Sequence, residues 1–227
     1  VKRLLPTYDV FDENRYFEAG EQSQSIKIDN TNFGVVICED GWNEEDKPLY
    51  KAHPVNDLTS QGCDFILSIN ASPTSLDKNN IRISNFENIV KRNGIPYISV
   101  NQVGGNDTII FDGGSFISFK DKTIQAPFFV EGVFLVDTLK NTTDWIGESN
   151  NIKAASYDSE EHKWVKYVHG MLVLGIKDYF RKNGISKASL ALSGGADSSL
   201  VLALAVDALG KDNITAVTMP SKISSSG

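Results

Sequence analysis

The 227 residues are 41% hydrophobic and 22% charged, a normal globular mix that excludes a disordered tail, a collagen-like repeat and a coiled coil. The net charge of −7 argues against a nucleic-acid or anionic-membrane partner held by bulk charge, because both require a basic surface. No apolar run approaches the ~18 residues of a membrane span, and the first residues lack the apolar region of a signal peptide. The only cysteines are Cys38 and Cys63, too few for a disulfide scaffold, so a cytoplasmic location is the natural expectation.

The first half of the chain alternates predicted strands and helices. Apolar runs at 33–37 and 65–69 have strand length, and residues 80–93 carry the apolar spacing of a helix that Gly94 ends. Further strands are predicted at 95–100, 108–111, 115–119 and 128–136, with 108–111 and 115–119 paired as a hairpin. This alternation indicates an α/β fold.

The second half begins after a change of composition. Residues 139–159 are polar and weakly periodic, which predicts an interdomain connection, and residues 160–183 form a long amphipathic helical pattern. A compact unit follows, with a strand at 188–192, a loop at 193–198, a helix at 198–209 and a strand at 214–218. Strand, helix and strand in about 30 residues are typical of a parallel crossover unit.

The loop of this unit has the composition of a phosphate-binding site. Glycines let the backbone approach an anion, and a helix N-terminus offers free N–H groups and partial positive charge. The hydroxyl groups of Ser193 and Ser198 add donors, whereas Asp197 makes sense beside phosphate if it holds a bridging Mg²⁺. The alternative is a Gly/Ser turn with Asp as a helix cap, and the common P-loop pattern is absent.

Cys38 is the candidate nucleophile, since it follows an apolar strand and precedes two carboxylates. A thiol requires an activating base, but the three histidines, His53, His162 and His169, form no convincing Cys–His pattern. On spacing alone, a cysteine in such a position is more often a small buried hydrophobe than a nucleophile.

Motifs around both sites carry a family resemblance. Residues 2–8 and 10–17, the VICEDGW segment at 36–42 and the NASP segment at 70–73 resemble the lysine, nucleophile and pocket segments of the nitrilase superfamily. The SGGADSS segment at 193–199 resembles the fingerprint of the N-type ATP pyrophosphatases, and Thr218–Ser221 with Ser224 and Ser225 resembles the segment that meets adenine and ribose. The two fingerprints in this order resemble the layout of glutamine-dependent NAD synthetases.

The resemblance implies a fold and a domain division. It implies a nitrilase-like α-β-β-α sandwich, incomplete at its N-terminus, followed by the start of a doubly wound parallel-sheet ATP pyrophosphatase domain. The expected domains are a glutaminase part at 1–138, a connection at 139–159 and an ATP-binding part at 160–227. We further expect an internal fragment of a larger enzyme, with a general-base Glu before residue 1 and deamido-NAD-binding residues after residue 227.

The resemblance also implies residue roles. Cys38 would attack the side-chain amide of glutamine, and Lys2 would stabilise the oxyanion together with the backbone N–H of Glu39. The implied glutamine pocket consists of Tyr8, Phe11, Glu39, Ser72 and Lys78. The implied ATP site consists of Ser193, Gly194, Gly195, Asp197, Ser198 and Met219, with Asp197 on Mg²⁺.

The implied activity is release of ammonia from glutamine and its use for ATP-dependent amidation of deamido-NAD to NAD, with AMP and pyrophosphate released. The implied partners are glutamine, ATP, deamido-NAD and further copies of the chain in a homo-oligomer. Two alternatives remain open: a non-catalytic nucleotide-binding or assembly module, and a stand-alone amidase. For Tyr8 and Phe11 the alternative is core packing, and for Ser72 and Lys78 it is a solvated loop.

Overall fold

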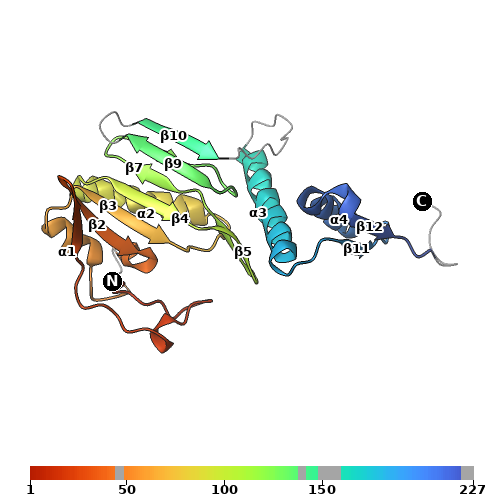
Figure 1. Cartoon of the computed structure of the whole chain (residues 1–227), viewed down its shortest axis with the longest axis horizontal. Coiled ribbons are helices and arrows are strands. Elements are labelled where there is room, and N and C mark those ends of the chain that lie inside the picture. The colour runs from red at the N-terminus through yellow and green to blue at the C-terminus, as the bar shows by residue number, and fades with distance from the viewer. Residues whose placement is uncertain (44–48, 138–141, 148–159, 221–227) are drawn as a thin grey trace. The chain divides into compact units, whose positions relative to one another are not determined.

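The computed structural model describes residues 1–43, 49–137, 142–147 and 160–220 (Figure 1). Most of the predicted connection, at 139–141 and 148–159, lies outside the described residues, as do Ser221, Ser224 and Ser225. The chain divides into two compact units, Val1–Val103 with Phe111–Ser149, and Gly104–Ile110 with Asn150–Gly227. The predicted domain boundaries stay a prediction.

The first unit is built on a six-stranded mixed sheet in the order β1-β2-β3-β4-β7-β8. Its strands are β1 (Ser25–Ile28), β2 (Thr31–Ile37), β3 (Phe65–Asn70), β4 (Tyr97–Asn101), β7 (Phe116–Ser118) and β8 (Thr123–Gln125). The strands β2, β3 and β4 are parallel, and the outer pairings are antiparallel. The predicted strands at 33–37, 65–69 and 95–100 are confirmed with shifted ends.

Helices α1 (Pro54–Ser60) and α2 (Lys78–Asn93) cover one face of this sheet. They share a single core cluster with the strands, in which Val55, Phe86, Ile66 and Tyr97 are fully buried. Phe86 stacks on Tyr97 with ring centroids 4.4 Å apart. The helix predicted at 80–93 is confirmed, and Gly94 ends it with a φ of 70°, the left-handed conformation that glycine adopts readily.

The predicted hairpin at 108–111 and 115–119 is wrong. β6 (Ile109–Asp112) pairs with β5 (Val103–Asn106), whereas β7 pairs with β4 and β8. Gly113 and Gly114 both have positive φ, 69° and 55°, so the chain turns sharply between β6 and β7. This turn lets β6 belong to the two-stranded sheet with β5 and β7 to the six-stranded sheet. The predicted strand at 128–136 is observed as β9 (Gly132–Asp137).

A strand also forms where the sequence predicts only a connection. β10 (Thr142–Gly147) pairs antiparallel with β9 along its length. The segment contains β-branched and aromatic residues, Thr142, Thr143, Trp145 and Ile146, which favour strands. The polar residues on either side made the segment look like a connection in the sequence, so the strand was not predicted.

The second unit contains α3 (Glu160–Lys182), β11 (Ala188–Ala191), α4 (Ala196–Leu209), β12 (Ile214–Val217) and the tip of the β5–β6 hairpin. The strands β11 and β12 are parallel, which confirms the predicted crossover unit. The α/β class predicted from the sequence is therefore confirmed in both units.

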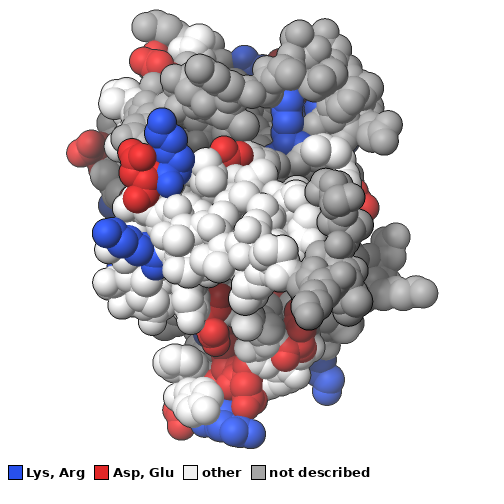
Figure 2. Space-filling view, turned by 90° about the vertical axis from the view of Figure 1, so that its right-hand side faces the viewer, with Lys and Arg blue, Asp and Glu red and all other residues white. Residues whose placement is uncertain are grey.

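Apolar side chains of α4 remain exposed in the part of the chain that the structure describes. Leu200 and Val201 are 61% and 46% exposed, and only Leu204 of this helix is buried. Figure 2 shows one face of the chain with a broad uncharged area bordered by charged side chains. The composition of α4 is that of a helix covered on more than one side, whereas several of its apolar side chains are exposed among the described residues.

Candidate active site

Cys38 lies at the carboxyl end of β2, where the 3₁₀ turn η2 (Cys38–Gly41) begins. Its φ of 45° is left-handed, a strained conformation for a residue other than glycine that is often found at functional sites. A side chain at Gly41 would collide with the buried Tyr97 hydroxyl, so glycine is required for the turn to pack on the core. The parallel strand β3 ends beside it, and this edge of an α/β sheet is where ligands bind.

A cavity of about 100 Å³ opens at Cys38. Its lining includes Cys38 and all five residues of the predicted glutamine pocket: Tyr8, Phe11, Glu39, Ser72 and Lys78. The structure therefore brings together residues that are up to 70 positions apart in the sequence, from Tyr8 to Lys78. The cavity volume suits one amino-acid side chain better than a drug-sized ligand. Trp42 also lines the cavity, and the Lys78 ammonium lies 4.5 Å from the centroid of its ring, a cation–π contact.

Lys2 is not among the residues that line this cavity, although its charge influences the pKa of the Cys38 thiol. Burial raises the pKa of Cys38 above its ordinary value, and the nearby charge of Lys2 partly opposes this rise. The Lys2 Nζ donates to Glu13 Oε1 at 2.6 Å. Sequence reasoning missed Glu13, because a separation of eleven residues from Lys2 matches no helix or strand periodicity. Glu13 lies in the 3₁₀ turn η1 (Glu13–Arg15), where its side chain contacts Lys2.

Glu39 is buried, with 4% of its surface exposed, and its carboxylate is held by two phenols. The Tyr8 hydroxyl donates to Oε2 at 2.8 Å, and the Tyr50 hydroxyl donates to Oε1 at 3.0 Å. Burial and the adjacent carboxylate raise the pKa of both phenols well above the usual value, so both remain donors. Tyr50 was also missed by sequence reasoning, since eleven positions separate it from Glu39. Asn43 donates hydrogen bonds to the Tyr50 and Ala52 carbonyls.

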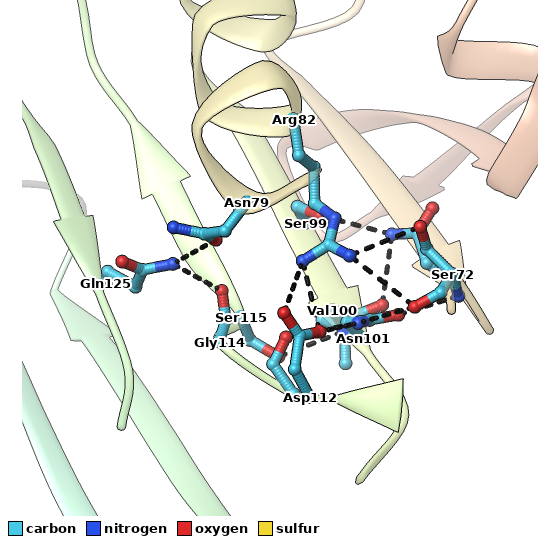
Figure 3. A network of polar contacts seen from close by, with 12 residues as sticks. Ser72, Asn79, Arg82, Ser99, Val100, Asn101, Asp112, Gly114, Ser115 and Gln125 are labelled. Carbon is cyan, nitrogen blue, oxygen red and sulfur yellow. Dashed lines mark hydrogen bonds and ion pairs between the residues drawn. The ribbon is translucent and has the colours of Figure 1, made fainter. Parts of the chain in front are cut away.

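A buried polar network supports Ser72 (Figure 3). The Ser72 N–H donates to Asn101 Oδ1 at 2.9 Å, and Arg82 Nη2 donates to the Ser72 hydroxyl at 3.3 Å. Arg82 and Asp112 form an ion pair at 3.2 Å with side-chain exposures of 1% and 0%. The network joins α2, β4 and β6 and fixes the loop that brings Ser72 to the cavity.

The predicted phosphate loop joins β11 to α4, and α4 begins at Ala196, two residues before its predicted start. Gly194 has a φ of 84°, and the hydroxyls of Ser193 and Ser198 lie 3.1 Å apart. Asp197 is exposed in the first turn of α4, and Met219, after β12, is 74% exposed. Gly195 precedes the helix, and no side chain of the described residues caps the N-terminus of α4, where the first backbone N–H groups lack helical partners.

Two observations concern metals and membranes. Within residues 1–43, 49–137, 142–147 and 160–220, no three His, Cys, Asp or Glu side chains gather as a metal site. The helices in this part of the chain also lack the length and apolar character needed to cross a membrane.

Comparison with known proteins gives concordant matches. A family model described as NAD synthase matches residues 168–227. The glutamine-dependent NAD(+) synthetase of Synechocystis sp. is 45% identical over 99% of this chain and 40% of its own length, and that of Rhodobacter capsulatus is 36% identical over 100% and 39%.

Solved structures agree. A glutamine-dependent NAD+ synthetase from Acinetobacter baumannii, in complex with ADP, aligns with a TM-score of 0.82 and 34% identity over 99% of this chain and 40% of that one. A second such synthetase, from Cytophaga hutchinsonii, aligns with a TM-score of 0.68 at 19% identity over 99% and 42%, which shows the shared fold. The chain spans about two fifths of the length of these relatives. The resemblance predicted from the sequence is thus confirmed: over nearly its whole length, this chain is similar to part of the glutamine-dependent NAD(+) synthetases.

Proposed function

We propose that this chain takes part in glutamine-dependent NAD synthesis, with one reaction at Cys38 and another at the loop 193–198. The observation that carries the proposal is the single cavity that unites Cys38 with five expected glutamine-pocket residues. The same chain holds a glycine-rich loop between a parallel strand and a helix.

At the first site, Cys38 Sγ attacks the side-chain amide carbon of glutamine. The charge that develops on the amide oxygen is stabilised by the Lys2 ammonium and the Glu39 backbone N–H. Ammonia leaves, and water hydrolyses the resulting thioester to glutamate. Because burial raises the pKa of the Cys38 thiol, the attack requires a base, which the resemblance leads us to expect before residue 1. Glu13 orients Lys2 through their ion pair.

Opposite charges at the cavity suit an amino acid. Glu39 presents a carboxylate held by two tyrosines, and Lys78 presents an ammonium positioned over Trp42. The α-ammonium and α-carboxylate of glutamine supply the complementary pair, so these side chains orient the substrate with its amide toward Cys38.

At the second site, the loop 193–198 binds the phosphates of ATP, and Met219 contacts its base. The free N–H groups of α4 and the two serine hydroxyls are donors suited to phosphate. Asp197 fits Mg²⁺, because this ion often takes one or two protein carboxylates together with phosphate oxygens and water. When bound, Mg²⁺ would neutralise charge on the pyrophosphate group that leaves as deamido-NAD is adenylated.

The resemblance also leads us to propose a cytoplasmic homo-oligomer that assembles through the amidase half. Light scattering of the natural full-length protein measures its mass in solution. A monomer over the whole concentration range would contradict the proposed assembly and leave the catalytic proposal unaffected.

Labelling with a glutamine-like diazo ketone tests the first reaction. We expect peptide mass spectrometry to find the label on Cys38 and not on Cys63, which is 4% exposed and packs in the core. The matched control is Cys38→Ser, which should remove labelling and glutamine hydrolysis together. Equal labelling of both cysteines, or no glutamine hydrolysis by the natural full-length protein, would refute the glutaminase function and favour the nucleotide-binding module.

A further inference from the structure

Asp40 joins the two segments that carry Lys2 and Cys38. Its Oδ1 accepts hydrogen bonds from the backbone N–H groups of Arg3 at 2.9 Å and Leu4 at 2.8 Å, and its Oδ2 accepts from that of Ile37 at 3.3 Å. Arg3 directly follows Lys2, and Ile37 directly precedes Cys38. One carboxylate therefore fastens both chain segments next to their reactive residues.

The environment of Asp40 makes this connection specific. Only 1% of the residue is exposed, and burial raises its pKa while the three N–H groups oppose the rise. A buried carboxylate is tolerated when donors such as these satisfy it. Without Asp40, three backbone N–H groups would lose their acceptors at the point where the two segments meet.

Both segments require such a restraint. Cys38 holds a strained left-handed φ of 45°, and strain of this kind persists only where the surroundings impose it. Lys2 carries its charge on a flexible stem, so the position of its ammonium depends on where its backbone is fixed. Glu13 holds the ammonium end by its ion pair, and Asp40 holds the backbone end.

We propose that Asp40 is a positioning residue for glutamine hydrolysis, which keeps the Lys2 ammonium beside the Cys38 thiol. The proposal rests on the proposed function, because this placement matters only if Cys38 is the nucleophile. Asp40 is absent from the lining of the Cys38 cavity, so it acts through Lys2 and Cys38 and not through contact with glutamine.

The test compares Asp40→Asn with Asp57→Asn in the natural full-length protein. Asp57 is a matched control because it also pairs with Arg3, but through the guanidinium group, and its side chain is 50% exposed. We expect Asp40→Asn to lower kcat for glutamine hydrolysis by about 10²-fold, the scale of an ångström displacement of reacting groups. KM for glutamine and NAD formation from free ammonia should remain unchanged, and Asp57→Asn should resemble the wild type.

A second readout follows the charge of Lys2 at the thiol. Alkylation of Cys38 by iodoacetamide, measured by peptide mass spectrometry over a pH series, should shift to higher pH in Asp40→Asn, because Lys2 lowers the pKa of Cys38. In a Lys2→Ala background, adding Asp40→Asn should produce no further shift. If Asp40→Asn does not fold, the same measurements are made on Asp40→Glu, which retains the charge but displaces the Arg3–Leu4 backbone that Asp40 binds.

The outcomes separate the two proposals. If the wild type hydrolyses no glutamine, the proposed function fails, and the alkylation profile still decides whether Asp40 positions Lys2. If the wild type is active while Asp40→Asn retains its kcat and its Cys38 profile, the positioning role is overturned. The positioning role would also be overturned if Asp40→Asn lowered kcat by the same factor in the Lys2→Ala background as in the wild type. Asp40 would then act on catalysis by a route that does not involve Lys2.

Discussion

At the scale of single residues, the Cys38 site depends on groups that satisfy one another's charge. Lys2 is paired with Glu13, and Glu39 is held by Tyr8 and Tyr50. Replacing Tyr50 by phenylalanine removes its hydroxyl and keeps its ring, so this change isolates the hydrogen bond to Glu39.

The variant Tyr50→Phe tests this dependence. Loss of one charge-assisted hydrogen bond should let Glu39 move, and we expect KM for glutamine to rise about tenfold, equivalent to about 1.4 kcal/mol. Tyr16→Phe is the control, since Tyr16 is 71% exposed. Steady-state kinetics of glutamine hydrolysis measure the change; an unaltered KM would show that Tyr50 does not orient Glu39.

The same tyrosines predict a loss of stability at alkaline pH. Their folded-state pKa values are raised by burial and by Glu39, so above the ordinary phenol pKa of about 10 the folded protein retains protons that the unfolded chain loses. This stabilisation is fully present below that pH and is lost as pH rises through the folded-state values. Melting temperatures of the wild type and Tyr50→Phe should converge over that interval; parallel curves would contradict the prediction.

At the scale of elements, two buried carboxylates connect strands to helices. Asp112 of β6 pairs with Arg82 of α2, and Asp178 of α3 accepts from the Gly105 N–H of β5 at 2.8 Å. The first connection supports the Ser72 loop, and the second lies within the second unit, where the hairpin tip meets α3.

Breaking the Arg82–Asp112 pair on one side should cost more than removing both charges. Asp112→Asn leaves an uncompensated buried guanidinium, and we expect about 3–5 kcal/mol of destabilisation. Arg82→Met combined with Asp112→Asn should cost less than the sum of the two single changes. Chemical denaturation of all three variants measures this, and additive losses would show that the two charges are not coupled.

Removing the Asp178 carboxylate should loosen the hairpin tip. Asp178 is 5% exposed, so Asp178→Ala leaves the Gly105 N–H without its acceptor at a cost of about 1–3 kcal/mol. Hydrogen exchange should accelerate at residues 104–110. The control is Asp207→Ala, which removes only an exposed contact to His169; equal exchange in both variants would contradict the assignment.

At the scale of the whole molecule, the proposed function assigns separate chemistry to the Cys38 site and to the loop 193–198. Gly195 has an ordinary φ of −82°, and a Cβ there would meet only the Ser193 hydroxyl, at 3.4 Å. Gly195→Ala is therefore compatible with the fold, so any lost activity reports on the ligand.

We expect Gly195→Ala to abolish NAD formation from either glutamine or ammonia while glutamine hydrolysis continues. Cys38→Ser should do the reverse, abolishing use of glutamine and retaining use of ammonia. Both activities are measured on the natural full-length protein. Loss of glutamine hydrolysis in Gly195→Ala, with the fold intact, would show that the two sites are not separable.

The sequence by itself determined the α/β class and the parallel crossover unit, and its resemblance to a known family supplied the residues expected around the Cys38 cavity. Strand and helix periods are local, and the motifs at Cys38 and Ser193 are contiguous, so both are readable in one dimension. Only the tertiary structure decided that β6 pairs with β5, that β10 forms, and that Glu13, Tyr50 and Asp40 reach the site. Pairing partners and buried hydrogen bonds depend on which distant segments the core brings together, and no local period encodes that choice.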